Sequence, residues 1–312
     1  MSVALLLAAL PALYWPEPVA TAAAVREAGI ERLLVPPDQV DAWRAAGVSA
    51  EPLRALDRKA RVSLDEPGLL VRADVASATL RPWVVANGWR FRRDPAGRFL
   101  YDALPPGKAA LATAEVFVHG ADAVLAIDPR DLVQVGLMLR FLATVPDAEL
   151  PEVADVAVVD DGSALLGEVL SLLARRNLLF RLVGAPDPDA RLTVQLGTEE
   201  FPRDEAADPD AFALAVRRRL TDARRSVRVF GSEVVLVRAV ADSSHARLHL
   251  LNYGGRPIAG LRVRFAGRWD AGRALGDGIG PMPLEDHSPS DDATEFTLPE
   301  LAIYTVVDLE AR

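Results

Sequence analysis

The sequence predicts two α/β parts followed by an all-β part, and three observations carry that prediction. Short apolar runs alternate with amphipathic helical segments near the amino terminus, and the same alternation returns from about residue 153. This order is typical of parallel sheets covered by helices. The final third shows strand-like runs separated by turn residues, with no long helical pattern between them. It favours a small antiparallel β-sandwich.

Length and composition limit the classes of function. The 312 residues suggest two or three domains, and a net charge of −9 argues against nucleic-acid binding. The absence of cysteine excludes disulfides, thiolate metal sites and Cys nucleophiles. The densest basic positions are Arg217–Arg219 and Arg224–Arg225. We interpret them as a solvated helix face in preference to an anion site.

The amino terminus has two interpretations. Residues 3–13 form an apolar run about as long as the core of a signal peptide and too short to span a bilayer. The favoured interpretation is a signal peptide over residues 1–12, which implies a secreted or periplasmic protein. The alternative is a buried first strand in a cytoplasmic protein. No other segment is a candidate membrane span.

The first α/β part begins regularly and is then interrupted. Gly29 and Gly47 each follow a helical segment, where a left-handed residue ends a helix, and Asp38 and Asp128 precede helices as predicted caps. Residues 61–102 break the pattern and suggest hairpins or a long excursion. The expected strands are 12–15, 32–35, a third near Val48 and 123–127, and the expected helices are 18–28, 38–46, 107–118 and 129–145.

The second α/β part and the sandwich show clearer patterns. Leu261, Val263 and Phe265 alternate with Arg262 and Arg264, so one strand face is apolar and the other cationic. The preceding strand, around 248–253, is apolar on both faces, and the glycines at 254–255 suggest a loop joining two antiparallel strands. The other expected elements are strands 156–159, 178–183, 192–196, 294–298 and 303–309, and helices 163–176 and 208–223.

Several segments together resemble those of bacterial glycoside-hydrolase-like proteins of the β-galactosidase type. They are YWPEP at 14–18, REAGIERLLVPP at 26–37, FGSEVVLVRAV at 230–240, LHLLNYGGRPIAGLRVRF at 248–265 and TEFTLPELAIYTVVDL at 294–309. The resemblance implies a β/α barrel, a glutamine-amidotransferase-like (flavodoxin-like) middle domain and a carboxy-terminal β-sandwich. It covers most of the chain, but none of these segments is a catalytic signature.

The resemblance implies domain boundaries and a shortened barrel. After the possible signal peptide, the expected domains are 13–150, 151–226 and 227–312. A complete eight-fold β/α barrel takes about 250 residues, so the first domain is expected to be a reduced or degenerate barrel. Amidotransferase chemistry needs a Cys nucleophile, which the chain lacks, so only the scaffold of that domain can remain.

Glycoside hydrolysis uses two carboxyl groups that flank the scissile bond, and a barrel displays them where its strands end. Acidic residues after expected strands are therefore the catalytic candidates, and nearby aromatic residues are candidates for stacking on a sugar. The catalytic candidates are Glu17, Asp65, Glu66 and Asp128, and the sugar-stacking candidates are Tyr14, Trp15, Trp83 and Trp89. Each also has a simpler explanation: a turn acid, a helix cap, or core packing.

Other candidate sites are weaker. Asp160 and Asp161 end a strand where a flavodoxin-like sheet binds ligands, although a helix-start turn is the favoured interpretation. His245 and His249 lie four residues apart on one strand, and a surface or packing role is favoured over metal binding. We expect no cofactor and no metal.

Two functions remain open. The first is hydrolysis of an extracytoplasmic saccharide by paired carboxylates. The second is a catalytically inactive relative that binds carbohydrate or serves in assembly, for which a homo-oligomer is one expectation.

Overall fold

The computed structural model describes residues 10–53, 60–64, 84–102 and 104–311. It divides into two compact units, which are considered separately: residues 1–66 with 94–146, and residues 67–93 with 147–312. Among the described residues, no helix is long and apolar enough to cross a membrane.

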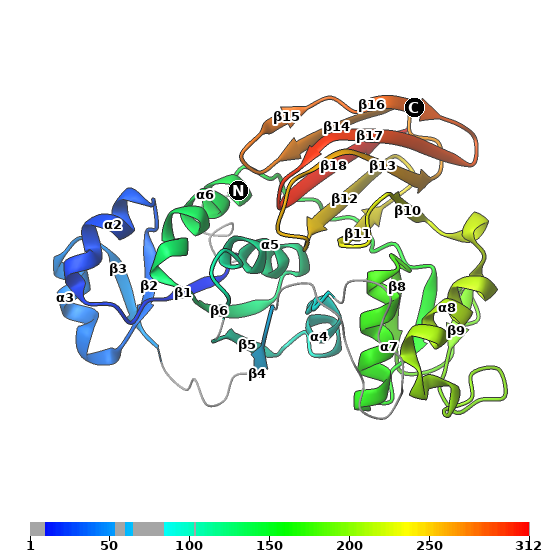
Figure 1. Ribbon diagram of the computed structural model, residues 1–312, viewed down its shortest axis with the longest axis horizontal. Helices are drawn as coiled ribbons and strands as arrows, with labels where there is room; N and C mark the ends of the chain where they lie inside the picture. Colours follow the sequence, from blue (N-terminus) through cyan, green and yellow to red (C-terminus); the bar gives the residue numbers. More distant parts are fainter. Residues whose placement is uncertain (1–9, 54–59, 65–83, 103, 312) are drawn as a thin grey trace. The chain divides into compact units, whose positions relative to one another are not determined.

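The first unit is built on a six-stranded parallel sheet (Figure 1). The strand order is β3-β2-β1-β6-β5-β4, so β1 lies between β2 and β6, the second and the last strands of the unit. In the described part of the chain, β3 and β4 each pair on one side only. The elements are β1 (Ala12–Tyr14), α2 (Ala22–Glu27), β2 (Arg32–Val35), α3 (Val40–Ala45), β3 (Ser49–Pro52), β4 (Ala60–Val62), β5 (Arg98–Tyr101), α5 (Ala109–His119), β6 (Asp122–Ala126) and α6 (Leu132–Leu142).

The helices of this unit bury the faces that the sequence suggested. Val40 and Trp43 of α3 are buried, and α5 is buried along almost its whole length because it packs on α6 and β6. Gly29 and Gly47 have φ values of 75° and 80°, which confirms their left-handed role after α2 and α3.

One local expectation in this unit is wrong. Asp38 does not cap a helix: Pro37 begins a 3-10 turn, Pro37–Gln39, so Asp38 lies inside that turn and makes no capping hydrogen bond. Residues 61–102 are expected from the sequence to hold hairpins or a long excursion. At the described ends of that segment β4 pairs with β5 in parallel register, and residues 65–83 lie outside the described residues.

The signal-peptide prediction falls mostly outside the described residues, which begin at Leu10. Within the predicted signal segment, Ala12 already belongs to β1 and pairs with Val124 of β6. Cleavage near Leu13 therefore remains a prediction, and it would remove the first residue of a strand in the middle of the sheet.

The second unit contains a short parallel sheet with two long helices. Its strand order is β8-β7-β9, and α7 and α8 pack on one another, as does α4 on α7. Asp208 caps α8 and Ser163 caps α7 through side-chain hydrogen bonds, which confirms the predicted helix starts. The elements are α4 (Gly88–Arg93), β7 (Val156–Val159), α7 (Ala164–Arg175), β8 (Phe180–Val183), β9 (Leu192–Val194) and α8 (Pro209–Leu220).

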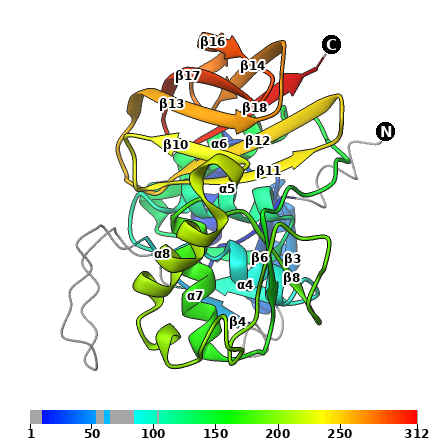
Figure 2. The same ribbon diagram turned by 90° about the vertical axis from the view of Figure 1, so that its right-hand side faces the viewer.

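The rest of this unit is an antiparallel β-sandwich, as predicted (Figures 1 and 2). One sheet has the order β10-β13-β17-β16 and the other β11-β12-β18-β14-β15. Alternate side chains of both sheets, such as Val263, Phe296, Leu248 and Val307, form one buried core. The strands are β10 (Val227–Phe230), β11 (Val235–Ala241), β12 (His245–Asn252), β13 (Ile258–Ala266), β14 (Ala271–Gly276), β15 (Gly280–Met282), β16 (Glu285–Pro289), β17 (Ala293–Leu301) and β18 (Tyr304–Glu310).

The loop at Gly254–Gly255 does not join paired strands, which corrects the prediction. β12 pairs with β11 and β18 in one sheet, whereas β13 pairs with β10 and β17 in the other. The loop therefore crosses between sheets. Gly255 has a φ of 73°, and a Cβ on Gly254 would lie 2.7 Å from a methyl carbon of Val234. Both glycines suit a tight crossing better than any larger residue would.

Candidate functional site

The carboxyl edge of the six-stranded sheet carries an acidic residue after several of its strands. Glu17 follows β1, Asp102 follows β5 and Asp128 follows β6. Because all the strands are parallel, these strand ends meet at one edge of the sheet. β1 and β6 are direct neighbours, with Tyr14 opposite Ala126, so the sheet brings the Glu17 and Asp128 segments to adjacent positions.

Asp128 is hydrogen-bonded to Arg130, two residues further along the chain. Its Oδ1 accepts hydrogen bonds from the Arg130 backbone N–H and Nε, both at 2.9 Å, and its Oδ2 accepts one from Nη2 at 2.7 Å. These bonds confirm Asp128 as the cap of the turn Pro129–Asp131. They lower the pKa of Asp128 to about 2, with the Arg130 side chain as the main cause. At neutral pH this group is a carboxylate and cannot donate a proton.

The acids Asp102 and Glu17 of this edge differ from Asp128. Asp102, which the sequence analysis missed, forms an ion pair with Arg61 of β4 at 2.6 Å. An acid directly after a strand could have identified it, but residues 98–101 were not recognised as a strand. Glu17 is half-buried and forms no ion pair with any described residue. Asp38, which follows β2 by the same number of residues, is exposed and also forms no ion pair with a described residue.

The predicted aromatic residues do not form one platform. Tyr14 is half-buried at the end of β1. Trp15 is 1% exposed and its Nε1 donates to Thr21 Oγ1 at 3.0 Å, so it is a core residue with no free face for a sugar. Trp89 belongs to the second unit, where its ring contacts Gly167 of α7 and the guanidinium groups of Arg90 and Arg93.

Three predicted site residues lie outside the described residues: Asp65, Glu66 and Trp83. Phe91, which the sequence places near Trp89, is buried in the core.

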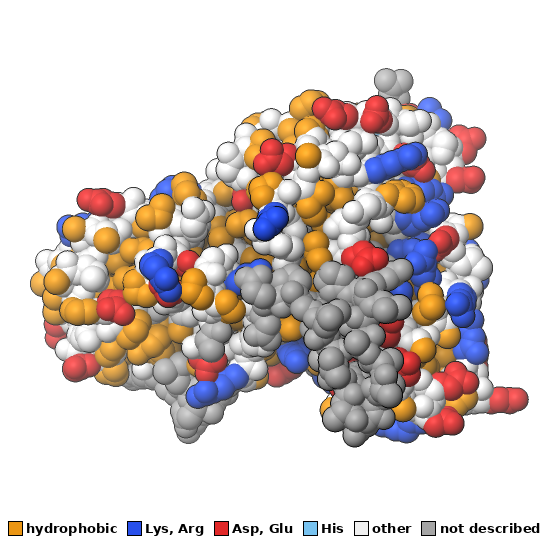
Figure 3. Space-filling view, viewed as in Figure 1, with side chains coloured by type: hydrophobic (Ala, Val, Ile, Leu, Met, Phe, Trp, Pro, Cys, Tyr) orange, Lys and Arg blue, Asp and Glu red, His pale blue; other side chains and the backbone are white. Residues whose placement is uncertain are grey.

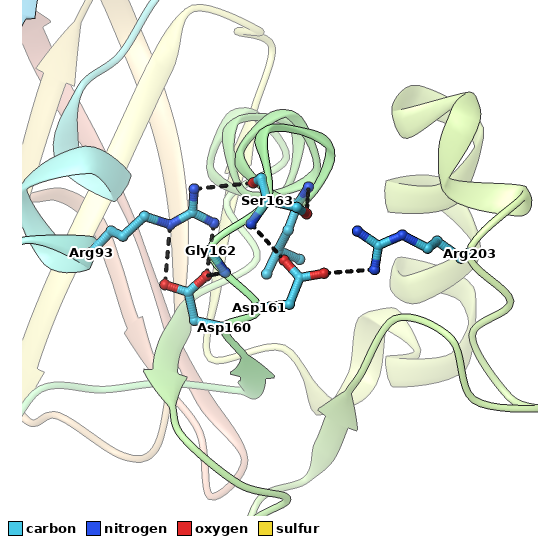
Figure 4. Close-up of polar contacts among 7 residues, drawn as sticks. Arg93, Asp160, Asp161, Gly162, Ser163 and Arg203 are labelled. Carbon is cyan, nitrogen blue, oxygen red and sulfur yellow. Dashed lines mark hydrogen bonds and ion pairs between the residues drawn. The ribbon is translucent and has the colours of Figure 1, made fainter.

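The turn between β7 and α7 gathers two acids and two arginines (Figure 4). Arg93 of α4 forms a bidentate pair with Asp160, at 2.8 and 3.1 Å, and Arg203 donates to Asp161 at 2.8 Å. Asp160 also accepts from the backbone N–H of Gly162 at 3.0 Å. Burial raises the pKa of Asp161, but hydrogen bonds from Ser163 and Arg203 outweigh it, so the net pKa is lowered.

The contacts of Asp160 and Asp161 indicate that this turn has a structural role and is not a catalytic site. Ser163 Oγ accepts from the Leu166 N–H at 3.1 Å, so the turn does start a helix, as the sequence analysis favoured. Both carboxylates are matched by guanidinium groups, and Arg93 also donates to the Ser163 carbonyl at 3.2 Å. The turn therefore fixes α4 and the loop of Arg203 against the carboxyl end of β7.

The two histidines of β12 have different environments, and only His249 packs in the protein interior. His249 is buried and its Nδ1 lies 2.8 Å from the hydroxyl of Tyr304, whereas the His245 side chain is 60% exposed. Burial first, and then the charges of Arg238 and Arg247, lower the pKa of His249 to about 3. No group of His, Asp and Glu suited to a metal ion occurs among the described residues.

Comparison with known proteins gives a fold and no family. No family model matches the sequence, and no curated protein matches it. Among solved structures, the chain is similar to α-L-fucosidase isoenzyme 2 from Paenibacillus thiaminolyticus. The two share 11% identity, over 69% of this chain and 60% of that one, with a TM-score of 0.50.

Two other sugar-processing enzymes are matched more loosely. A rhamnosidase from Novosphingobium sp. PP1Y gives 10% identity over 87% of this chain and 38% of that one, with a TM-score of 0.44. A GH42 β-galactosidase from G. stearothermophilus gives 11% identity over 66% and 51%, with a TM-score of 0.39. The chain thus spans about 60% of the fucosidase and less of these two. Its fold is similar to that of a glycoside hydrolase.

Proposed function

We propose that this protein is a glycoside-hydrolase-like protein that acts on a saccharide at the carboxyl edge of its six-stranded sheet. One observation carries the proposal: Glu17 and Asp128 follow adjacent parallel strands. Neighbouring strands lie about 4.8 Å apart. Carboxyl groups in retaining glycosidases lie about 5–5.5 Å apart, and those in inverting enzymes about 6.5–9.5 Å apart. Adjacent strand ends suit either geometry.

Asp65 and Glu66 are the other candidate partners of Glu17, and both lie outside the described residues. Asp128 is the candidate partner that follows a strand paired directly with β1.

The two acids have different environments, as the two roles require. Asp128, with a pKa near 2, stays ionised and would act as the nucleophile or stabilise the positive charge that develops on the sugar. Glu17, half-buried between two prolines, would be the general acid. Tyr14, at the end of β1, would contact the sugar ring.

The strand order also supports a reduced-barrel origin. The order β3-β2-β1-β6-β5-β4 is that of a six-stranded ring opened between β3 and β4. We propose that the first domain (13–150) is a barrel that has lost βα units. We further propose that 151–226 is an amidotransferase-like scaffold and that 227–312 is the sandwich domain. Secretion after cleavage near residue 12 is part of the same proposal.

Nitrophenol release from a panel of nitrophenyl glycosides, including α-L-fucoside and β-galactoside, tests this function. We expect turnover of at least one substrate, and a loss of about 100-fold or more in Glu17→Gln, as removal of a general acid normally causes. Glu31→Gln is the matched control, because Glu31 precedes β2 and lies at the opposite edge of the sheet. Equal activity in Glu17→Gln and Glu31→Gln would reject Glu17 as the acid.

A second function is favoured by a specific observation. Arg130 occupies both oxygens of Asp128, and Arg61 pairs with Asp102, so the acids that follow β5 and β6 are already matched. A protein with this edge could bind a saccharide without cleaving it. Binding on a glycan array with no nitrophenol release would support that function, and light scattering would show whether it accompanies a homo-oligomer.

A further inference from the structure

The second unit contains a cavity of about 490 Å³ between the carboxyl end of α7, α8 and β10. This volume lies in the range of small-molecule sites, about 300–1,000 Å³. Arginine dominates the wall. The lining arginines are Arg175, Arg176, Arg217, Arg225 and Arg228. Figure 3 shows Lys and Arg side chains gathered on the part of the surface that belongs to β10 and α8.

Positive charge exceeds the negative charge around this cavity. The five arginines face Asp210 and Glu233 in the wall, and Asp222 lies behind Arg217 and Arg225. Five positive and three negative charges leave a balance of +2. The carboxyl end of α7 adds about half a negative charge, which does not cancel that balance. The whole chain, by contrast, carries −9, so the concentration of positive charge is local.

Part of this cluster is structural. Arg176 pairs with Asp210 at 2.6 Å, and Arg217 forms a bidentate pair with Asp222 at 2.8 and 2.9 Å. Arg225, 5% exposed, donates to Asp222 at 3.0 Å and to the carbonyl of Arg176 at 2.7 Å, which satisfies the end of α7. The interpretation of these arginines as a solvated face is therefore wrong for Arg225, whereas Arg218 and Arg219 of α8 are exposed as expected.

One arginine of the cavity wall is available to bind a ligand. Arg228 of β10 lines the cavity and forms no ion pair with any described residue; its guanidinium lies 5.0 Å from the ring of Phe230. The pKa of Arg225 is lowered by burial first, and also by the charges of Arg217 and Arg228. An anion in the cavity would offset this crowding of like charges.

We propose that this cavity binds a small ligand through an oxyanion group, a carboxylate, phosphate or sulfate, with Arg228 as a direct contact. Guanidinium groups bind such oxyanions through paired, charge-assisted hydrogen bonds. The ring of Phe230 lines the same cavity and supplies an apolar surface for the rest of the ligand. The proposal does not depend on glycoside hydrolysis.

Isothermal titration calorimetry of the whole chain tests the site with four probes: inorganic phosphate, glucuronate, glucose 6-phosphate and neutral glucose. We expect at least one oxyanion to bind, glucose not to bind, and binding to weaken in 0.5 M NaCl because salt screens the charges. Equal affinity for inorganic phosphate and glucose 6-phosphate would limit the site to the oxyanion. Preference for glucuronate or for glucose 6-phosphate would show that the site also binds the sugar ring, and would identify its anion as a carboxylate or a phosphate.

Arg228→Gln should weaken binding about tenfold or more, the usual effect of losing a charge-assisted hydrogen bond. Arg262→Gln is the matched control, because Arg262 also lies over Phe230, at 5.6 Å, but is outside the cavity wall. Glu233→Gln removes a negative charge from the wall and should tighten binding severalfold, so the test does not depend on one variant folding. The proposal is overturned if no oxyanion binds at millimolar concentration, or if Arg228→Gln and Arg262→Gln bind alike.

Discussion

His249 should make the sandwich sensitive to acid. Its side chain is buried on β12, and its pKa falls from 6.5 to about 3 in the folded protein. In the unfolded chain it takes up a proton near pH 6.5. Below that pH the unfolded state binds more protons than the folded state, so the free energy of unfolding falls as the pH falls, until the pH reaches about 3.

The size of this effect follows from the shift. Each pKa unit corresponds to about 1.4 kcal/mol. Stability should therefore fall by about 2 kcal/mol between pH 7 and pH 5, and by about 3 kcal/mol by pH 4. His249→Gln keeps an acceptor near the Tyr304 hydroxyl but cannot take up a proton, so it should lose this part of the pH dependence.

Urea-induced unfolding followed by circular dichroism at pH 7, 6, 5 and 4 measures the effect. The difference between wild type and His249→Gln at each pH isolates the contribution of His249. His245→Gln, an exposed position on the same strand, should keep the wild-type pH dependence. Parallel stability curves for wild type and His249→Gln would refute the assignment of a buried, neutral histidine.

Three substitutions test the packing of each unit, and thermal unfolding measures all of them. Gly136→Ala should destabilise the first unit by about 2 kcal/mol or more, because a Cβ there would lie 1.9 Å from the Ala28 carbonyl oxygen; an unchanged melting temperature would contradict this contact. Leu170→Ala should cost about 2–5 kcal/mol, since Leu170 is fully buried in the core around α7, and a cost under 1 kcal/mol would argue against that core. Ser163→Ala should cost about 1 kcal/mol through loss of the α7 cap, whereas Ser163→Asp should restore most of it.

Periodicity and capping residues predicted most of the elements. The alternation of Leu261, Val263 and Phe265 with arginines identified β13, because one face of that strand is buried and the other exposed. Asp208 and Ser163 marked the starts of α8 and α7 because their side chains do cap those helices. Asp38 misled the same rule, since the 3-10 turn begins at Pro37 and Asp38 lies inside it.

Which strands pair could not be predicted in the same way. The Gly254–Gly255 loop has the composition of a hairpin, but β12 and β13 pair with β18 and β17, about 60 and 35 residues further along the chain. Pairing is decided by the packing of both sheets, and local composition does not contain that information. Strands such as β14 to β16 lack a strong apolar alternation and were not recognised.

The candidate sites, like the strands, were predictable only as far as local sequence determines them. Position after a strand identified Glu17 and Asp128, and strand order was needed to make them neighbours. Trp15 looked like a sugar contact in the sequence, but its side chain lies in the core. The arginine-rich cavity could not be recognised, because its wall combines Arg176 of the α7 end, Arg217 of α8 and Arg228 of β10.

Hydrogen–deuterium exchange tests the central claim, that a saccharide binds at the carboxyl edge of the six-stranded sheet, whether or not it is cleaved. The chain would be compared with and without the saccharide that gives the strongest response on the panel or array. We predict slower exchange in the peptides covering residues 14–18 and 127–131, which follow β1 and β6. Unchanged exchange in both peptides, with protection confined to other parts of the chain, would contradict the claim.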